Sequence, residues 1–172
     1  MLTINFSPYP VITTARLVLR EITEEDAQEI YFLRSDTRVM QFLDRPALQS
    51  EQEGLELTRK IIDAVAKNEG ITWGISLKNE KKLVGTIGFW KITKEHFRAE
   101  IGYLLNPQLQ GKGYMQEAMN EVIDYGFTKM GIHSIEANVN PNNTASIKLL
   151  EKNQFVREAY HRENYYYNGQ FL

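Results

Sequence analysis

The chain has 172 residues, 42% of them hydrophobic and 24% charged, and its 20 basic and 22 acidic side chains give a net charge of −2. This composition predicts one globular domain over residues 1–172, and the even charge excludes a nucleic-acid partner bound through backbone charge. The absence of cysteine and the scattered histidines exclude thiolate chemistry and predict no metal site. The lack of a signal peptide or long apolar run predicts a cytoplasmic protein with no membrane partner.

The first part of the chain predicts one strand, two helices and then a run of strands. Residues Thr14–Glu21 alternate with a period of two, which is typical of a half-buried strand. Thr23 and the three acids after it predict a capped helix start, and we expect this helix to end near Asp36. A second helix is predicted over about Ser50–Asn68, from apolar residues at helical spacing. Three strands are then expected at Ile71–Leu77, Leu83–Lys91 and Phe97–Leu105.

Helices and strands alternate in the rest of the chain. A helix is predicted from Gly113 to Met130, with Gly131 placed to cap its C-terminus. The further predicted elements are a strand at Ser134–Val139, a helix at Asn142–Lys152, a long strand at Phe155–Tyr167 and a hairpin turn at Asn168-Gly169. This order predicts a mixed α/β (α+β) sheet that is antiparallel in its middle and has a strand–helix–strand crossover near its end.

The loop Gln108–Gly113 leads from a predicted strand to a helix N-terminus. Its glycines, Gly111 and Gly113, allow unusual backbone dihedrals and a close approach to a ligand. The first turn of a helix has unpaired N–H groups and a positive dipole end, which suit an anion such as a pyrophosphate, and Lys112 adds a cation. The alternative is an ordinary strand–helix turn. Neither the Rossmann nor the Walker A pattern is present.

The spacing Gln108-x-x-Gly111-x-Gly113 resembles the Q/R-x-x-G-x-G/A signature of the GCN5-related N-acetyltransferases (GNAT superfamily). Further segments, over nearly the whole chain, resemble its ribosomal-protein-alanine N-acetyltransferase-like (RimJ/RimL-type) branch. They are TARLVLRE at 14–21, Glu100-Ile101-Gly102-Tyr103, Gly113-Tyr114-Met115-x-Glu117-Ala118, and Asn143-Thr144-Ala145-Ser146 followed by Leu149-Leu150-Glu151-Lys152.

This resemblance implies a GNAT fold, in which a mixed central sheet with splayed fourth and fifth strands is flanked by about four helices. It also implies acetyl-CoA as cofactor and direct transfer of the acetyl group to an amine in a ternary complex. The free backbone of the strand before the loop then holds the pantetheine arm and polarises the thioester carbonyl. The implied cofactor-binding residues are Tyr103, Leu104, Leu105, Gln108, Gln110, Gly111, Lys112, Gly113, Tyr114, Met115, Asn143 and Ser146.

Acetyl transfer needs a base for the amine and an acid for the departing thiolate. Glu100 is the first candidate for the base, directly or through a water, because an α-amino group with a pKa of about 8 needs only modest help. The alternative for Glu100 is a solvent-facing residue or a partner of Arg98. Ser146, or a nearby tyrosine, is the candidate acid; the alternative for Ser146 is a helix-terminal serine that serves only the helix. The candidates for the acceptor groove are Tyr31, Phe32 and Arg34 on the first predicted helix.

Two positions depart from the family pattern. Gln154 stands where the family usually has glycine; a left-handed conformation there costs ~1–2 kcal/mol, and we expect Asn153 to take over the cap. The family continues past the Asn168-Gly169 turn into a full final strand, whereas only Gln170–Leu172 follow here, so the strand looks truncated. We therefore expect the edge at Tyr165–Tyr167 to be frayed or covered by another subunit, which leaves a homodimer open.

The sequence does not identify the amine acceptor. The resemblance points to a protein N-terminal α-amine, and the alternative is a small molecule such as an amino acid, a polyamine or an aminoglycoside. A non-catalytic acyl-CoA-binding module on the same fold is a second class. A nucleotide-binding protein is disfavoured because the Walker lysine–serine pair is missing.

Overall fold

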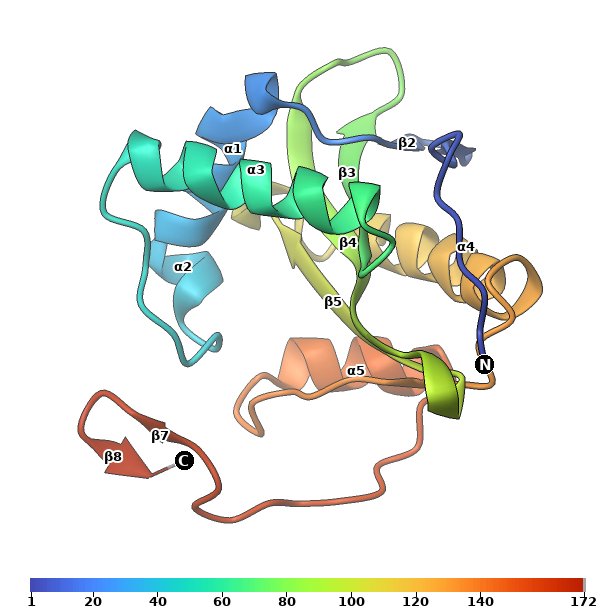
Figure 1. Cartoon of the computed structure of the whole chain (residues 1–172). Helices are drawn as coiled ribbons and strands as arrows, with labels where there is room; N and C mark the ends of the chain where they lie inside the picture. The colour runs from blue at the N-terminus through green and yellow to red at the C-terminus, as the bar shows by residue number, and fades with distance from the viewer. Residues whose placement is uncertain (172) are drawn as a thin grey trace.

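A six-stranded sheet forms the centre of the computed structural model, which describes residues 1–171 (Figure 1). Its strands lie side by side in chain order: β1 (Ile12–Thr13), β2 (Leu17–Arg20), β3 (Ile71–Leu77), β4 (Leu83–Thr93), β5 (Arg98–Leu105) and β6 (Ser134–Glu136). All neighbours are antiparallel except β5 and β6, which are parallel and joined by a helical crossover. The predicted mixed sheet and its crossover are therefore confirmed.

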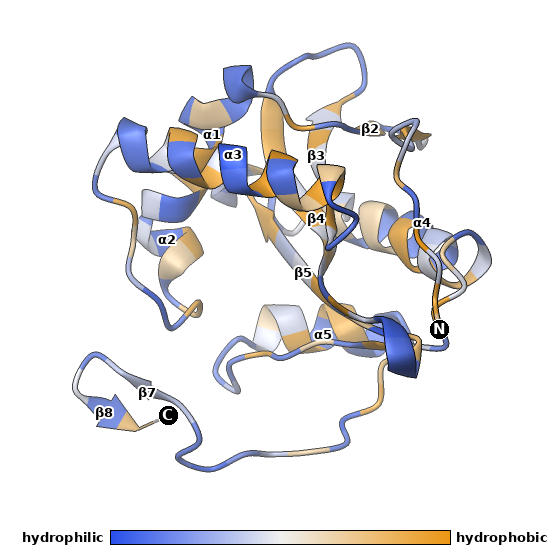
Figure 2. Ribbon diagram, in the orientation of Figure 1, coloured by the Kyte–Doolittle hydropathy of each residue, from blue (hydrophilic) through white to orange (hydrophobic). Residues whose placement is uncertain are grey.

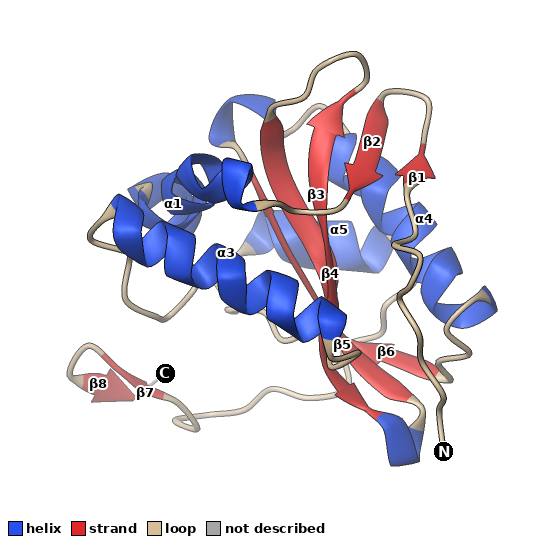
Figure 3. Cartoon of the chain, turned by 45° about the horizontal axis from the view of Figure 1, so that its top comes forward, coloured by secondary structure: helices blue, strands red, loops and turns tan. Residues whose placement is uncertain are grey.

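Helices cover both faces of this sheet (Figure 3). They are α1 (Ala27–Ser35), α2 (Thr37–Met40), α3 (Glu51–Ala66), α4 (Tyr114–Thr128) and α5 (Thr144–Lys152), with 3-10 turns η1 (Glu24–Asp26), η2 (Lys94–His96) and η3 (Pro107–Leu109). α1 and α3 pack on one face around Ile30 and Leu33, while α4 and α5 bury Met119 and Leu150 on the other. Figure 2 shows hydrophobic colour on the strands and on the helix sides that face them. Within residues 1–171, each helix is too short or too polar to cross a bilayer.

The sheet splits between β5 and β6. The two strands pair only from Arg98–Ser134 to Glu100–Glu136, whereas β5 stays paired with β4 as far as Leu105–Gly85. β6 ends at Glu136, three residues before the end predicted from the sequence, Val139. The remainder of β5 therefore has one open edge. The family resemblance implied this split for the fourth and fifth predicted strands, which are β5 and β6 here because the short β1 precedes them.

The start of α1 is fixed by a buried ion pair. The guanidinium of Arg20 on β2 binds both carboxylate oxygens of Asp26, at 2.7 and 2.9 Å, and Asp26 also accepts the N–H of Thr23 at 2.9 Å. The capped helix start predicted at Thr23 is thus confirmed. Because Asp26 is only 6% exposed, the pair holds α1 firmly against the sheet.

The long strand predicted at Phe155–Tyr167 is wrong. Residues 155–165 form no strand, and Val156–Tyr166 are exposed. Only β7 (Tyr166–Tyr167) and β8 (Gln170–Phe171) pair, in a hairpin apart from the main sheet (Figure 1). The physical reason is that alternating side chains do not make a strand unless a neighbouring strand pairs with its backbone. A cover supplied by another subunit stays a prediction.

The left-handed residue after α5 is Gln154 rather than Asn153. Gln154 has φ +65°, in the left-handed region, whereas Asn153 has φ −92°. The N–H of Gln154 donates to Glu151 O at 3.0 Å and that of Phe155 to Leu150 O at 3.1 Å, which together form a Schellman motif. The expectation that Asn153 takes over the cap holds in part: Asn153 donates its side-chain amide to Leu149 O at 2.7 Å, but the motif fixes the left-handed position one residue later, at Gln154.

We expect Gln154→Gly to stabilise the protein by about 1 kcal/mol. Glycine removes the left-handed strain, and the greater conformational entropy that it gives the unfolded chain offsets part of this stabilisation. Denaturant titration measures the change. Asn153→Gly is the matched control; it places glycine at a right-handed position and should give no gain. Equal effects of both substitutions would contradict this account of the cap.

Candidate active site

The loop after β5 is shaped by its capping residues and glycines. The side chain of Asn106 accepts the N–H of Gln108 at 3.0 Å, and Pro107 begins the short η3 turn. Gly111 and Gly113 then have φ of +72° and +79°, which other residues adopt only with strain. A Cβ at Gly111 would meet nothing within 4 Å, so the backbone there borders open space.

The N-terminus of α4 opens onto this loop. The first helical hydrogen bond runs from the N–H of Glu117 to Gly113 O, at 3.1 Å. The N–H groups of Tyr114, Met115 and Gln116 have no backbone acceptor within residues 1–171. Three free donors at the positive end of a 15-residue helix provide a site for an anion. The loop and the helix start therefore fit a pyrophosphate.

Arg16 fastens the start of β2 to this loop, a link that the sequence did not predict. Its Nη1 donates to Lys112 O at 2.9 Å, its Nε donates to Glu117 Oε2 at 2.6 Å, and its guanidinium lies 4.4 Å from the centre of the Tyr114 ring. Burial disfavours the charge of Glu117, but hydrogen bonds from Thr14 and Arg16 outweigh burial and hold the pKa of this carboxyl below its usual range. Arg16 thus fixes both the loop and the first turn of α4.

Because this clamp orders the loop, we expect Arg16→Gln to raise the dissociation constant for coenzyme A by about tenfold. Hydrogen bonds to charged groups contribute about 1.5–3 kcal/mol, and 1.4 kcal/mol corresponds to a tenfold change in affinity. Calorimetric titration with coenzyme A measures the effect. The control is Arg59→Gln, which breaks an exposed pair with Glu24. An unchanged affinity in Arg16→Gln would show that the loop orders itself without the clamp.

The strand before the loop offers its backbone at alternate residues. The N–H of Asn106 donates to Val84 O on β4, at 2.8 Å, so by strand alternation the main-chain groups of Leu104 also point toward β4. Those of Tyr103 and Leu105 point to the open edge. Leu105 O accepts the side-chain amide of Gln110 at 3.2 Å. Tyr103 and Leu105 thus have the free backbone predicted for the cofactor strand, and Leu104 does not.

Several predicted cofactor residues have side chains that face inward. Met115 is 8% and Leu105 7% exposed, and both pack in the core beneath α4. The side chain of Leu104 packs on the opposite face, beside α1 and α3. A ligand in the open edge can therefore meet Met115 and Leu105 through their backbone but not through their side chains.

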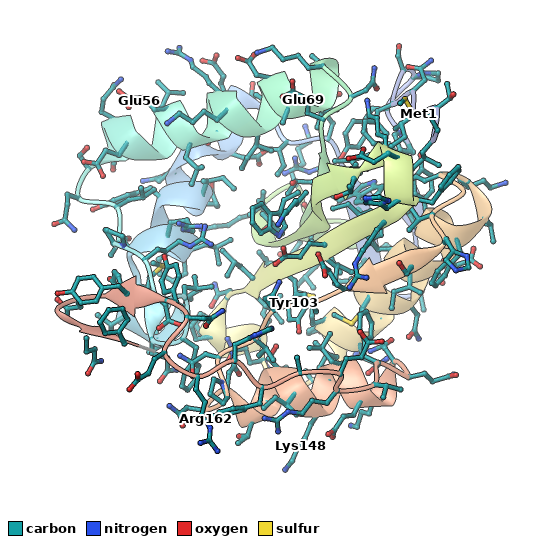
Figure 4. All side chains as sticks on the ribbon, turned by 60° about the horizontal axis from the view of Figure 1, so that its bottom comes forward. Met1, Glu56, Glu69, Tyr103, Lys148 and Arg162 are labelled. Carbon is teal, nitrogen blue, oxygen red and sulfur yellow. The ribbon has the colours of Figure 1, made fainter. Side chains whose placement is uncertain are left out.

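Tyr103 and Ser146 are brought together across the opening. Their hydroxyl oxygens lie 2.6 Å apart, and Tyr103 lies between the sheet and α5 near the centre of Figure 4, where Lys148 points outward. Asn143 caps α5, since its Oδ1 accepts the N–H of Ser146 at 3.0 Å. Burial raises the pKa of the Tyr103 phenol, and the hydrogen bond with Ser146 offsets part of this rise. The phenol is therefore protonated at neutral pH, and the Ser146 hydroxyl contacts a residue outside its own helix.

Glu100 lies on the other face of β5. Ala99 and Ile101 pack in the core beneath α4, so strand alternation directs Glu100 toward the face that carries α1 and α3. It is 7% exposed, and Arg98 pairs with Glu136 at 2.7 Å instead. The alternative of a solvent-facing residue or an Arg98 partner is therefore wrong.

A tryptophan on β4 lies over Gly102, two residues along β5 from Glu100. A Cβ on Gly102, the next residue on this face of β5, would lie 3.2 Å from Cδ1 of Trp90. Trp90 is 54% exposed. An exposed ring on the same face as a buried carboxyl gives this face an apolar wall and one polar group, a combination that suits a small ligand.

The predicted acceptor residues on α1 differ in packing and exposure. Tyr31 packs against α3, where a Cβ on Gly54 would lie 2.6 Å from the Cβ of Tyr31. Phe32 is 38% exposed. Arg34 is half-buried, and its Nε has no hydrogen-bond partner within residues 1–171. Contact of these three side chains with an acceptor stays a prediction.

A split parallel pair of strands, with an anion site at the following helix, defines a class of transferases that bind acyl-coenzyme A at the open strand edge. The chain belongs to the acetyltransferase (GNAT) domain family, whose model matches residues 16–156. The family resemblance read from the loop and the flanking motifs is therefore confirmed, and the chain is an acetyltransferase.

Known proteins that resemble the chain differ in acceptor. It is 35% identical to the uncharacterized N-acetyltransferase YoaA of Bacillus subtilis, over 94% of this chain and 91% of that protein. It is 29% identical to the [ribosomal protein uS5]-alanine N-acetyltransferase of Escherichia coli, over 93% and 85%. The crystal structure of spermidine N-acetyltransferase from Vibrio cholerae in complex with CoA and spermine matches with a TM-score of 0.80, at 26% identity over 92% and 91%.

Proposed function

We propose that the protein transfers an acetyl group from acetyl-CoA to an amine, directly and within a ternary complex. The observation that carries this proposal is that two binding surfaces are adjacent along the chain. They are the free N–H groups of Tyr114–Gln116 and the open backbone edge at Tyr103 and Leu105. The first suits the pyrophosphate and the second the pantetheine arm of one ligand. CoA in the related spermidine acetyltransferase supports the same cosubstrate here.

The proposed reaction needs the acceptor amine deprotonated and the departing thiolate protonated. Glu100 takes the proton that the ammonium form of the acceptor loses before attack, directly or through a water. The neutral nitrogen then attacks the thioester carbonyl carbon, a C–N bond forms, and the C–S bond breaks with its electron pair on sulfur, while the nitrogen releases its second proton to solvent. Tyr103, hydrogen-bonded to Ser146, gives a proton to the departing thiolate. Free N–H groups of β5 stabilise the oxyanion that forms between these steps.

The positions of the two groups suit these opposite roles. Glu100 faces the α1 and α3 side of β5, whereas Tyr103 faces the α4 and α5 side. An amine that enters from the first side and a thiol that leaves toward the second need not cross each other's path. Tyr103 is therefore added to the catalytic pair named from the sequence, and Ser146 becomes its hydrogen-bond partner.

For the acceptor, we propose a protein N-terminal α-amine of the ribosomal-protein type. The likeness to the uS5-alanine acetyltransferase supports it. A small amine is the second candidate, favoured by the likeness to a spermidine acetyltransferase. One catalytic domain over residues 1–172 and a cytoplasmic location belong to the same proposal.

The test is an acetyl-CoA turnover assay read by released thiol, against N-terminal peptides and small amines that include spermidine. Thermal stabilisation by CoA, compared with ATP, checks the cofactor separately, because a ligand that binds only the folded state raises the melting temperature. We expect stabilisation by CoA and turnover with at least one amine. CoA binding without turnover of any amine would contradict the proposed reaction.

A further inference from the structure

Arg34 differs from the arginines that hold the fold together, because no carboxylate within residues 1–171 forms an ion pair with it. Its Nε is buried and lacks a hydrogen-bond partner within residues 1–171. Arg45, whose charge acts on Arg34, donates among the described residues only to Leu43 O, at 3.4 Å. In contrast, five other arginines are paired: Arg16 with Glu117, Arg20 with Asp26, Arg38 with Asp36, Arg59 with Glu24 and Arg98 with Glu136.

The two guanidinium groups repel each other. Burial lowers the pKa of Arg34, and the positive charge of Arg45 lowers it further. Arginine nevertheless stays protonated in proteins, so the structure holds two like charges near each other with one donor desolvated. Such an arrangement is unfavourable by itself and becomes favourable when an anion binds between or beside the charges.

The local carboxylates do not fill this role. Asp36 binds Arg38 at 2.6 Å. Asp44, next to Arg45, accepts both of its hydrogen bonds from the side-chain amide of Asn140, at 3.0 and 3.2 Å. Within residues 1–171, neither carboxylate therefore forms an ion pair with Arg34 or Arg45.

The same contacts bring the pair near the segment before α5. The N–H of Leu48 donates to Arg34 O at 2.9 Å, which ties the loop after α2 to the end of α1. The bond between Asp44 and Asn140 then ties that loop to the segment before α5, three residues ahead of Asn143. Figure 1 shows the loop after α2 beside the loop that leads into α5. These contacts place the end of α1 and the loop that carries Arg45 near the segment that leads to Asn143 and Ser146.

We infer that Arg34 and Arg45 bind an anionic group, a carboxylate, carried by the acceptor a few bonds from the amine that is acetylated. This inference rests on the proposed function and narrows its acceptor. The guanidinium fork matches a carboxylate in two-point geometry, which leaves the amine to reach Glu100. A polyamine would bring further positive charge to the same place and is disfavoured. The carboxylate comes either from a free amino acid or from an acidic residue near a peptide N-terminus.

The test compares acceptors of opposite charge. C-terminally amidated Ala-Glu-Glu and Ala-Lys-Lys separate acidic from basic peptides, and free glutamate and spermidine do the same for small amines. We expect the acidic member of the preferred pair to have the higher kcat/KM by about tenfold or more. Arg34→Gln and Arg45→Gln should each raise its KM by about tenfold, with kcat and the KM for acetyl-CoA retained.

Arg38→Gln is the matched control, because Arg38 lies between the two positions in sequence but already pairs with Asp36. It should leave the acceptor KM unchanged. Arg45 is exposed, so its variant tests the idea even where Arg34→Gln fails to fold. Preferred turnover of spermidine or Ala-Lys-Lys, or an acceptor KM insensitive to both variants, overturns the inference and leaves the proposed function standing.

An equilibrium measurement separates the two proposals. Calorimetric titration of the CoA-saturated protein with each peptide reads binding without turnover. If no amine is acetylated, the proposed function fails, while tighter binding of Ala-Glu-Glu that is lost in Arg45→Gln still supports the anion site. Equal binding of both peptides, or binding of neither, counts against that site.

Discussion

Tyr103→Phe is expected to lower kcat for acetyl transfer by about 100-fold, at the lower end of what general acid catalysis contributes. The substitution removes one hydroxyl, which lies 2.6 Å from that of Ser146, and keeps the half-buried ring. Burial raises the pKa of this phenol, so it remains a neutral donor throughout the range in which the enzyme is assayed. The departing thiolate then loses its proton source, while the loop proposed to bind the cofactor is untouched.

Steady-state assays at saturating acetyl-CoA and calorimetric CoA binding check this result together. Ser146→Ala leaves the phenol in place without its partner and should cost less, about tenfold. Tyr125→Phe is the control for a half-buried tyrosine outside the site, since its ring packs against Trp73 with centroids 5.2 Å apart. Full activity in Tyr103→Phe would show that another group, or water, protonates the thiol.

Local patterns account for most of the fold that the sequence predicted. The alternation at Thr14–Glu21 and the helical spacing of apolar residues depend on each segment alone, and the corresponding elements exist. The strand predicted at Phe155–Tyr167 failed because its alternation is equally local, whereas a strand exists only through a partner that the pattern does not supply. The expectation of a left-handed Asn153 failed for a related reason, because the Schellman hydrogen bonds, rather than side-chain preference, fix which residue is left-handed.

The site divides in the same way. Gly111 and Gly113 were found from the sequence because their spacing within one loop carries the signal. Arg16 was missed because its partner Glu117 lies 101 residues away, and the pair exists only once β2 is folded beside α4. Tyr103 was predicted to bind the cofactor through its backbone. Its phenol was not singled out, because the Ser146 hydroxyl that it contacts lies 43 residues further along the chain.

Glu100→Gln is the second large effect expected, a fall of about 100-fold in kcat/KM near neutral pH. Glutamine keeps the shape of a side chain that is 7% exposed, but it cannot take a proton from the amine. The carboxylate of Glu100 is available for this task because Arg98 binds Glu136 instead. Glu95→Gln, at an exposed position on the turn before β5, is the control for loss of a nearby charge.

The pH dependence of this deficit distinguishes a base from a merely structural carboxylate. An acceptor that is already neutral needs no base, so the deficit of Glu100→Gln should shrink as the pH rises through the pKa of the amine. For an α-amino acceptor this occurs near pH ~8, and for an alkyl amine of the lysine type only near ~10.4. Profiles of kcat/KM against pH for the wild type and the variant measure the size of the deficit and the pH at which it shrinks. A deficit that stays constant across this range means that Glu100 supports the site without taking the proton.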